Sequence, residues 1–232
     1  MGEKVRFESD GATAEGYLAV PDFGPGPGVV VIQEYWGLVP HITDVCDRFA
    51  EAGFAALAPD LFHGQTTTEP DEAGKLMMAL NIGQATREMS GAVDHLRAND
   101  AVSSEKVGAV GFCMGGGLAM ALACERPDAI GACVAFYGLI PWPDLEPDWS
   151  RLDCPVLGHF AENDAFFGPD QARALEERLH EHGKEATITV HPGAQHAFFN
   201  DTRPEVHDPE LSEKAWHQTL NFLKRNLEVL TP

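Results

Sequence analysis

Short runs of apolar residues alternate along the chain with longer segments in which apolar residues recur every three or four positions. The short runs are rich in Val, Ile, Ala and Phe, which is typical of strands buried on both faces of a sheet. The predicted strands span residues 28–33, 54–58, 106–112, 129–136, 155–160 and 186–191. The longer segments have the spacing of amphipathic helices. The predicted helices span residues 41–52, 88–98, 115–125, 171–182 and 210–227.

Near the start of the chain, apolar and polar residues alternate at residues 5–9 and again at residues 15–20. The Asp10-Gly11 pair between these two runs predicts a hairpin turn. The regular alternation of strand and helix that follows predicts an α/β fold with a mostly parallel central sheet and helices on both faces. We expect a single domain over residues 1–232. Residues 63–84 and 139–152 break the rhythm, and we interpret them as lids or binding loops.

Charge narrows the range of partners. The chain has 36 acidic and 16 basic residues, so its formal net charge is −20. This excess of acid argues against nucleic acid and anionic membranes as partners, because phosphate binding needs clustered Lys and Arg. The N-terminal residues lack the apolar core of a signal peptide, and no apolar stretch is long enough to cross a membrane.

Cysteine usage indicates the compartment. The chain has an odd number of cysteines, five, and no pair has the C-x-x-C spacing of a zinc or redox site. We therefore expect free thiols and a cytoplasmic protein.

The most specific motif is Gly111-Phe112-Cys113-Met114-Gly115, between a predicted strand and a predicted helix. This is the context of a nucleophile elbow, in which glycines flank a sharply turned nucleophile. A helix N-terminus under the side chain favours the thiolate form of Cys113. The alternative is a structural cysteine beside a glycine-rich helix, which is our interpretation of Cys46, Cys124, Cys133 and Cys154.

A thiol nucleophile needs a base and an acid that orients the base. Asp164 and His196 each follow a predicted strand, at the edge where open α/β sheets place their sites. The order nucleophile, acid, histidine is that of α/β hydrolases. Glu162 competes with Asp164 as the acid, and His191 competes with His196 as the base, although His191 lies within a strand.

The segment Gln33-Glu34-Tyr35-Trp36-Gly37 follows the first buried strand. One oxyanion N–H of α/β hydrolases comes from this loop, and another comes from the residue after the nucleophile. The backbones of Tyr35 and Met114 are therefore the candidates. An anionic Glu34 beside them is unusual, and it is either a structural carboxylate or a switch that acts on the resting thiol.

The runs QEYWG, GFCMGGG, AENDAFF and GAQHAFFND together resemble the dienelactone hydrolase family, whose members are cysteine enzymes of the α/β-hydrolase fold. The resemblance covers about residues 5–227 and implies hydrolysis of a lactone or simple ester through an acyl-thioester, without a metal or organic cofactor. It implies Cys113 as nucleophile, His196 as base and Asp164 as its partner. It also implies that Glu34 engages the resting thiol until substrate binding releases a thiolate toward His196.

One departure from the family concerns substrate charge. The dienelactone-specific members bind the substrate carboxylate with arginines, one of them four residues after the catalytic histidine, where this chain has Asn200. Residues 63–84 contain no arginine, and we expect Arg203 to be a surface residue. The sequence therefore favours a neutral lactone or short-chain ester. We expect Trp36, Met77, Leu80 and Phe198 to line the substrate pocket.

Other classes of function remain. The same fold could serve a non-catalytic binding protein or a redox protein with Cys113 as a peroxide-reactive thiol. A zinc enzyme ranks lower, because the ten histidines show no ligand pattern. The sequence does not decide between a monomer and a homodimer.

Overall fold

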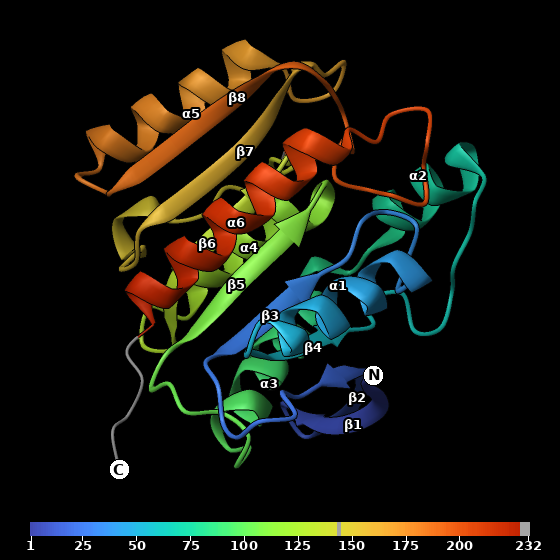
Figure 1. Cartoon of the computed structure of the whole chain (residues 1–232), viewed down its shortest axis with the longest axis vertical. Helices are drawn as coiled ribbons and strands as arrows, with labels where there is room; N and C mark the ends of the chain where they lie inside the picture. The colour runs from blue at the N-terminus through green and yellow to red at the C-terminus, as the bar shows by residue number, and fades with distance from the viewer. Residues whose placement is uncertain (143–144, 228–232) are drawn as a thin grey trace.

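The computed structural model describes residues 1–142 and 145–227, and its centre is an eight-stranded sheet with the order β1-β2-β4-β3-β5-β6-β7-β8 (Figure 1). Strand β2 pairs antiparallel with both of its neighbours, and every other neighbouring pair is parallel. The strands are β1 (Glu3–Ser9), β2 (Ala12–Ala19), β3 (Gly28–Ile32), β4 (Ala55–Pro59), β5 (Val107–Phe112), β6 (Ile130–Phe136), β7 (Val156–Asn163) and β8 (Ala186–Gln195). The predicted mostly parallel α/β sheet is confirmed.

Helices cover both faces of the sheet, also as predicted. The helices are α1 (Pro40–Glu51), α2 (Pro70–Ala79), α3 (Ile82–Arg97), α4 (Met114–Glu125), α5 (Pro169–Glu181) and α6 (Pro209–Asn226). Helices α1 and α6 pack on one face, where Phe49 and Leu223 are among the buried residues. Helices α3, α4 and α5 pack on the other face, with Met89, Leu118 and Leu179 in its core.

The excursion at residues 63–84, which we interpreted as a lid or binding loop, is largely helical. It contains the whole of α2 and the first turn of α3, which begins six positions before the predicted helix at 88–98. The reason is local, because Asn81 Oδ1 accepts the N–H of Gln84 at 3.0 Å and caps α3. The described part of the excursion at 139–152 ends in a short 3₁₀ turn, Trp149–Arg151, and residues 143–144 lie outside the described residues.

The two excursions contact each other. The indole Nε1 of Trp142 donates to the carbonyl oxygen of Met77 at 3.1 Å. Met77 and Leu80 are half-buried against the core, while Met78 is exposed. One hydrogen bond thus joins the end of α2 to the segment that follows β6.

The connections between strands define an edge for a site. From β3 the chain crosses to β4 on one side, and from β4 it returns to β5 on the other side of β3. Such a reversal opens a crevice at the carboxyl ends of the two central strands. Glu34 follows β3 and Cys113 follows β5, so both lie at that reversal.

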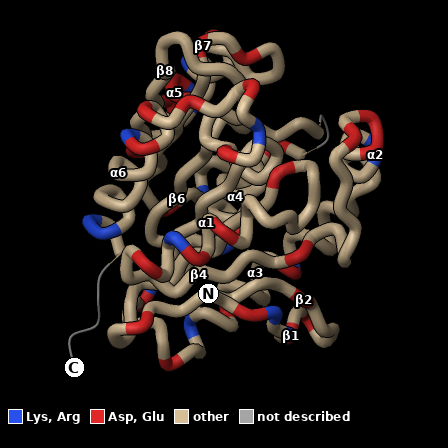
Figure 2. The backbone as a smooth tube through the Cα atoms, turned by 45° about the vertical axis from the view of Figure 1, so that its right-hand side comes forward, with Lys and Arg blue, Asp and Glu red and all other residues tan. Residues whose placement is uncertain are grey.

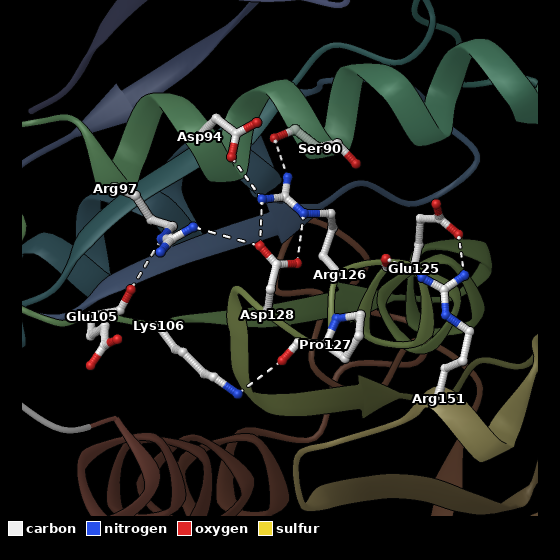
Figure 3. A network of polar contacts seen from close by, with 10 residues as sticks. All are labelled: Ser90, Asp94, Arg97, Glu105, Lys106, Glu125, Arg126, Pro127, Asp128 and Arg151. Atoms are coloured by element: carbon white, nitrogen blue, oxygen red, sulfur yellow. Dashed lines mark hydrogen bonds and ion pairs between the residues drawn. The ribbon is translucent and has the colours of Figure 1, made fainter.

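The opposite edge of the sheet holds an ionic network (Figure 3). Arg126, just after α4, donates to Asp94 at 2.8 Å and to Asp128 at 3.0 Å, and Lys106 donates to the carbonyl oxygen of Pro127 at 2.8 Å. Elsewhere acidic positions are scattered along the whole backbone (Figure 2). The Arg126 side chain is 17% exposed and its carboxylate partners are about 60% exposed, and ion pairs at a surface contribute about 0–1 kcal/mol each.

No helix within the described residues is long and apolar enough to cross a membrane.

Candidate active site

Cys113 occupies a strained turn between β5 and α4. Its φ of 55° and ψ of −123° lie outside the usual regions for a residue with a side chain. A Cβ on Gly111 would collide with the carbonyl of Gly115, and a Cβ on Gly115 would collide with the carbonyl of Ile32. The two flanking glycines therefore allow the turn, and they hold a thiol that is 8% exposed at the start of α4.

His196 and Asp164 form a close pair beside this turn. His196 Nδ1 lies 2.7 Å from Asp164 Oδ2, and Asp164 Oδ1 accepts the N–H groups of Phe166 and Phe167 at 2.8 and 3.0 Å. The competing carboxylate, Glu162, is exposed and accepts a backbone N–H instead. The Asp164 side chain is fully buried, so the imidazole is held by a carboxylate that is itself fixed by the backbone.

The imidazole interacts with both of its expected partners. Burial opposes protonation of His196, but the hydrogen bond with Asp164 and the neighbouring Cys113 side chain raise the pKa of His196 to about 10. The same pairing holds the pKa of Asp164 below its usual range in spite of burial. The arrangement therefore favours a positively charged imidazole at His196, held by the Asp164 carboxylate.

Glu34 lies at the same edge and is 1% exposed. Its Oε1 accepts the hydroxyl of Tyr137 at 3.3 Å, and its Oε2 accepts the amide Nδ2 of Asn200 at 2.8 Å. Sequence reasoning missed Tyr137, although it directly follows β6 at the carboxyl edge and could have been found by that rule. The bond from Asn200 to Glu34 has no sequence signal, because the two residues are far apart in the chain.

The two backbone N–H groups predicted for an oxyanion site belong to Tyr35, shortly after β3, and to Met114, the first residue of α4. Within residues 1–142 and 145–227, neither the N–H of Tyr35 nor that of Met114 has a hydrogen-bond acceptor. Cys113 uses its own N–H to pair with the carbonyl of Phe136 at 3.0 Å. Two unused donors beside a nucleophile are what an oxyanion site requires.

The predicted pocket residues separate into two groups. Trp36 lines a cavity of about 440 Å³ with Asn200 and Arg203, and the Arg203 guanidinium lies 5.7 Å from the Trp36 ring centre. Arg203, which we expected at the surface, has a side chain that is 31% exposed and pairs with Glu205 at 2.9 Å. Phe198 is fully buried and packs against Tyr137, so it presents no surface to a substrate.

The remaining thiols and histidines have different surroundings. The other four cysteines are buried free thiols, and burial raises the pKa of each one, to about 12 for Cys124 and Cys154. His191, the competing base, is buried within β8, and its Nε2 lies 3.1 Å from Nδ1 of His159 on β7. No cluster of three or more His, Cys, Asp or Glu suited to a metal ion occurs among the described residues.

Comparison with known proteins identifies the family to which the chain belongs. The family model described as "Dienelactone hydrolase family" matches residues 14–227. "Protein usf" of Aquifex pyrophilus is 38% identical, over 98% of this chain and 100% of that protein. A candidate carboxymethylenebutenolidase of Aquifex aeolicus is 34% identical, over 98% and 100% of the two chains. The crystal structure of a candidate dienelactone hydrolase from Klebsiella pneumoniae has a TM-score of 0.86 at 27% identity, over 97% of this chain and 98% of that one.

Proposed function

Because the chain belongs to the dienelactone hydrolase family, we propose that it hydrolyses lactones or small carboxylic esters with Cys113 as the nucleophile. One observation carries the proposal: a strained thiol, a buried histidine–carboxylate pair and two unused N–H groups all lie at the carboxyl edge of one sheet. Two relatives of at least 30% identity over nearly the whole chain have names of this activity.

The first half of the reaction forms a thioester. The Cys113 thiolate attacks the ester carbonyl carbon, and the N–H groups of Tyr35 and Met114 stabilise the negative oxygen that develops. When this intermediate collapses, the C–O bond breaks and the departing alkoxide takes a proton from the His196 imidazolium. With a lactone substrate the alcohol stays attached to the acyl group.

The second half regenerates the enzyme. Neutral His196 takes a proton from water as the water oxygen attacks the thioester carbonyl. The second intermediate expels the Cys113 thiolate and leaves the carboxylic acid. Asp164 holds the imidazole and stabilises its positive form in both halves, as its 2.7 Å contact with Nδ1 permits.

The charge of the site favours a neutral substrate. The buried Glu34 carboxylate has no cationic partner among the described residues, and the guanidinium of Arg203 is already paired with Glu205. An anionic substrate would have to approach a chain with a net charge of −20. Loss of one charged hydrogen bond costs about 1.5–3 kcal/mol, so we expect kcat/KM to favour a neutral ester over a carboxylate-bearing dienelactone by about tenfold to hundredfold. Measurement of both substrates at two salt concentrations tests this, and a clear preference for the dienelactone would refute it.

The decisive experiment removes the thiol. We expect Cys113→Ala to lose essentially all ester hydrolysis while it keeps its unfolding temperature, and mass spectrometry of the native enzyme mixed with a slow ester should find the acyl group on Cys113. Cys124→Ala is the matched control, because that thiol is also buried but lies at the far end of α4. Retention of more than about a tenth of the rate by Cys113→Ala would exclude Cys113 as nucleophile.

A further inference from the structure

A cavity distinct from the one beside Trp36 lies on the face of the sheet that carries α4 and α5. Its volume is about 410 Å³, which is within the usual range for small-molecule sites. Met120 of α4, one side of α5 and the segment after β6 form its walls. Among the described residues that line it, none belongs to the candidate catalytic set of Cys113, Asp164 and His196. The cavity is therefore a separate feature of the fold.

One stripe of α5 forms the mouth of the cavity. Gln171, Ala174, Leu175 and Arg178 line it, and their spacing places all four on the same side of the helix. Leu175 is 6% exposed and lies at the base of the stripe, whereas the other three residues are exposed. A small molecule can thus enter from solvent past the surface of α5.

The charges at the cavity compensate each other. Among the described lining residues, the only charged side chains are those of Glu146 and Arg178. Arg178 Nη1 donates to Glu146 Oε1 at 3.0 Å, and both side chains are more than half exposed. The pair leaves no uncompensated charge on the walls, so the cavity suits a neutral molecule.

Two buried indoles in the wall differ in their hydrogen bonding. Trp142 and Trp149 are 8% and 6% exposed, and both line the cavity. The Nε1 of Trp142 donates to the carbonyl oxygen of Met77 at 3.1 Å, whereas the Nε1 of Trp149 is buried and has no acceptor among the described residues. An indole N–H can only donate, and a buried donor without an acceptor is unfavourable. The wall therefore contains an unused donor.

We propose that this cavity binds a neutral, largely apolar molecule with one hydrogen-bond acceptor, such as an aromatic ketone or ether, and that the Trp149 N–H donates to that acceptor. The indole rings and the aliphatic side chains of the wall would pack on the apolar part of the ligand. The amide Nε2 of Gln171 already donates to the carbonyl oxygen of Phe166 at 3.3 Å, which leaves Trp149 as the donor. The site goes beyond the proposed hydrolase function, because it uses neither Cys113 nor His196.

NMR of the indole N–H groups tests the proposal, with benzophenone as the probe. Benzophenone is neutral, has two rings and a single carbonyl acceptor, and has no ester bond that the protein could cleave. The four tryptophans give four indole signals, which Trp→Phe variants assign. We expect benzophenone to move the Trp149 proton signal downfield and to leave the Trp36 and Trp216 signals in place. Diphenylmethane, which has the same rings without the oxygen, should not cause the downfield shift.

Two variants measure what the cavity contributes to binding. Trp149→Phe keeps an aromatic ring but removes the donor, so the Kd for benzophenone should rise about tenfold. Trp216→Phe removes an indole N–H on α6, outside the cavity lining, and is the matched control that should bind as the native protein does. Ala174→Trp changes an exposed position at the mouth and should block binding without loss of the fold. It decides the question if Trp149→Phe does not fold.

Three outcomes would overturn the inference: a Trp149 signal that does not move in a saturated benzophenone solution, a shift of the Trp36 signal alone, or native binding by Ala174→Trp. A shift of Trp36 alone would place the probe in the other cavity, which Trp36 lines. Failure of the proposed function is a separate result, because it appears as ester hydrolysis retained by Cys113→Ala.

Discussion

Strands β7 and β8 carry two histidine centres whose charges differ. At the ends of the strands, His196 pairs with Asp164, and its pKa rises to about 10. In the middle of the same strands, His159 and His191 bond each other at 3.1 Å, and the hydroxyl of Thr219 lies 3.3 Å from His159. Burial, and then the charge that His191 would carry, lowers the pKa of His159 to about 3.

The comparison shows that the partner, and not burial, decides the charge of a buried histidine. His159 is completely buried, and the His196 side chain is only 15% exposed, so both lose most of their hydration. A carboxylate partner offsets that loss by attraction to the imidazolium, whereas a second imidazole offers only a neutral hydrogen bond. The first centre can hold a proton for chemistry, and the second stabilises the sheet as a neutral pair.

The largest expected effect comes from removing the reactive imidazole. His196→Gln should lower kcat/KM by at least about a thousandfold, because in the proposed mechanism the thiol then loses its base and the leaving group loses its acid. His191→Gln serves as the matched substitution at the other centre and should leave kcat/KM per folded molecule within about threefold. Equal losses in the two variants would erase the functional distinction between the centres.

Removing the carboxylate should make the first centre resemble the second. In Asp164→Asn, the pKa of His196 should fall below its ordinary 6.5, since burial then acts without its main counterweight. We expect kcat to fall by about a hundredfold to a thousandfold because the imidazole loses its orientation. Titration of the His196 ring signals by NMR measures the pKa, and an unchanged pKa would show that another group supports the imidazolium.

The pKa shifts of His196 and Asp164 also make the free energy of unfolding depend on pH. The pKa of His196 in the folded protein is raised above 6.5. Its contribution to the free energy of unfolding is therefore fully present below pH 6.5 and is lost as the pH rises through about 10. The carboxyl of Asp164 has a lowered pKa, so its contribution is present above about pH 3.8. Asp164→Asn should therefore destabilise the protein most between pH 4 and 6.5, and less above pH 10.

The smallest expected effect concerns acid stability at the second centre. The folded pKa of His159 is lowered, so the unfolded chain binds more protons than the folded chain below pH 6.5. The free energy of unfolding therefore decreases as the pH decreases in that range. Such a histidine costs up to about 2 kcal/mol of unfolding free energy between pH 7 and 5. His191→Gln removes one titrating partner, and urea unfolding at the two pH values should show a smaller loss than in the native protein. A steeper loss would mean that the pair does not stay neutral.

Much of the fold and of the candidate site could be predicted from the sequence. The features that could not be predicted share one cause. The buried strands and the residues at their ends follow a local rule, since β-branched runs predict strands and parallel strands present their carboxyl ends at one edge. The start of α3 was missed because Asn81 provides the cap before the apolar periodicity begins. The contacts of Glu34 with Tyr137 and Asn200, and the contact of Arg203 with the Trp36 ring, depend on how distant loops meet. Periodicity carries no information about that.

The five strands that supply the candidate site are consecutive in the sheet: Glu34 follows β3, Cys113 follows β5, Tyr137 follows β6, Asp164 follows β7 and His196 follows β8. Each parallel pairing among them joins segments that are distant in the chain, and such pairings form slowly during folding. A refolding chain can therefore form its hairpin and helices early and still have no reactive centre. Recovered activity should lag behind recovered helical signal, and it reports the moment at which the last strand docks.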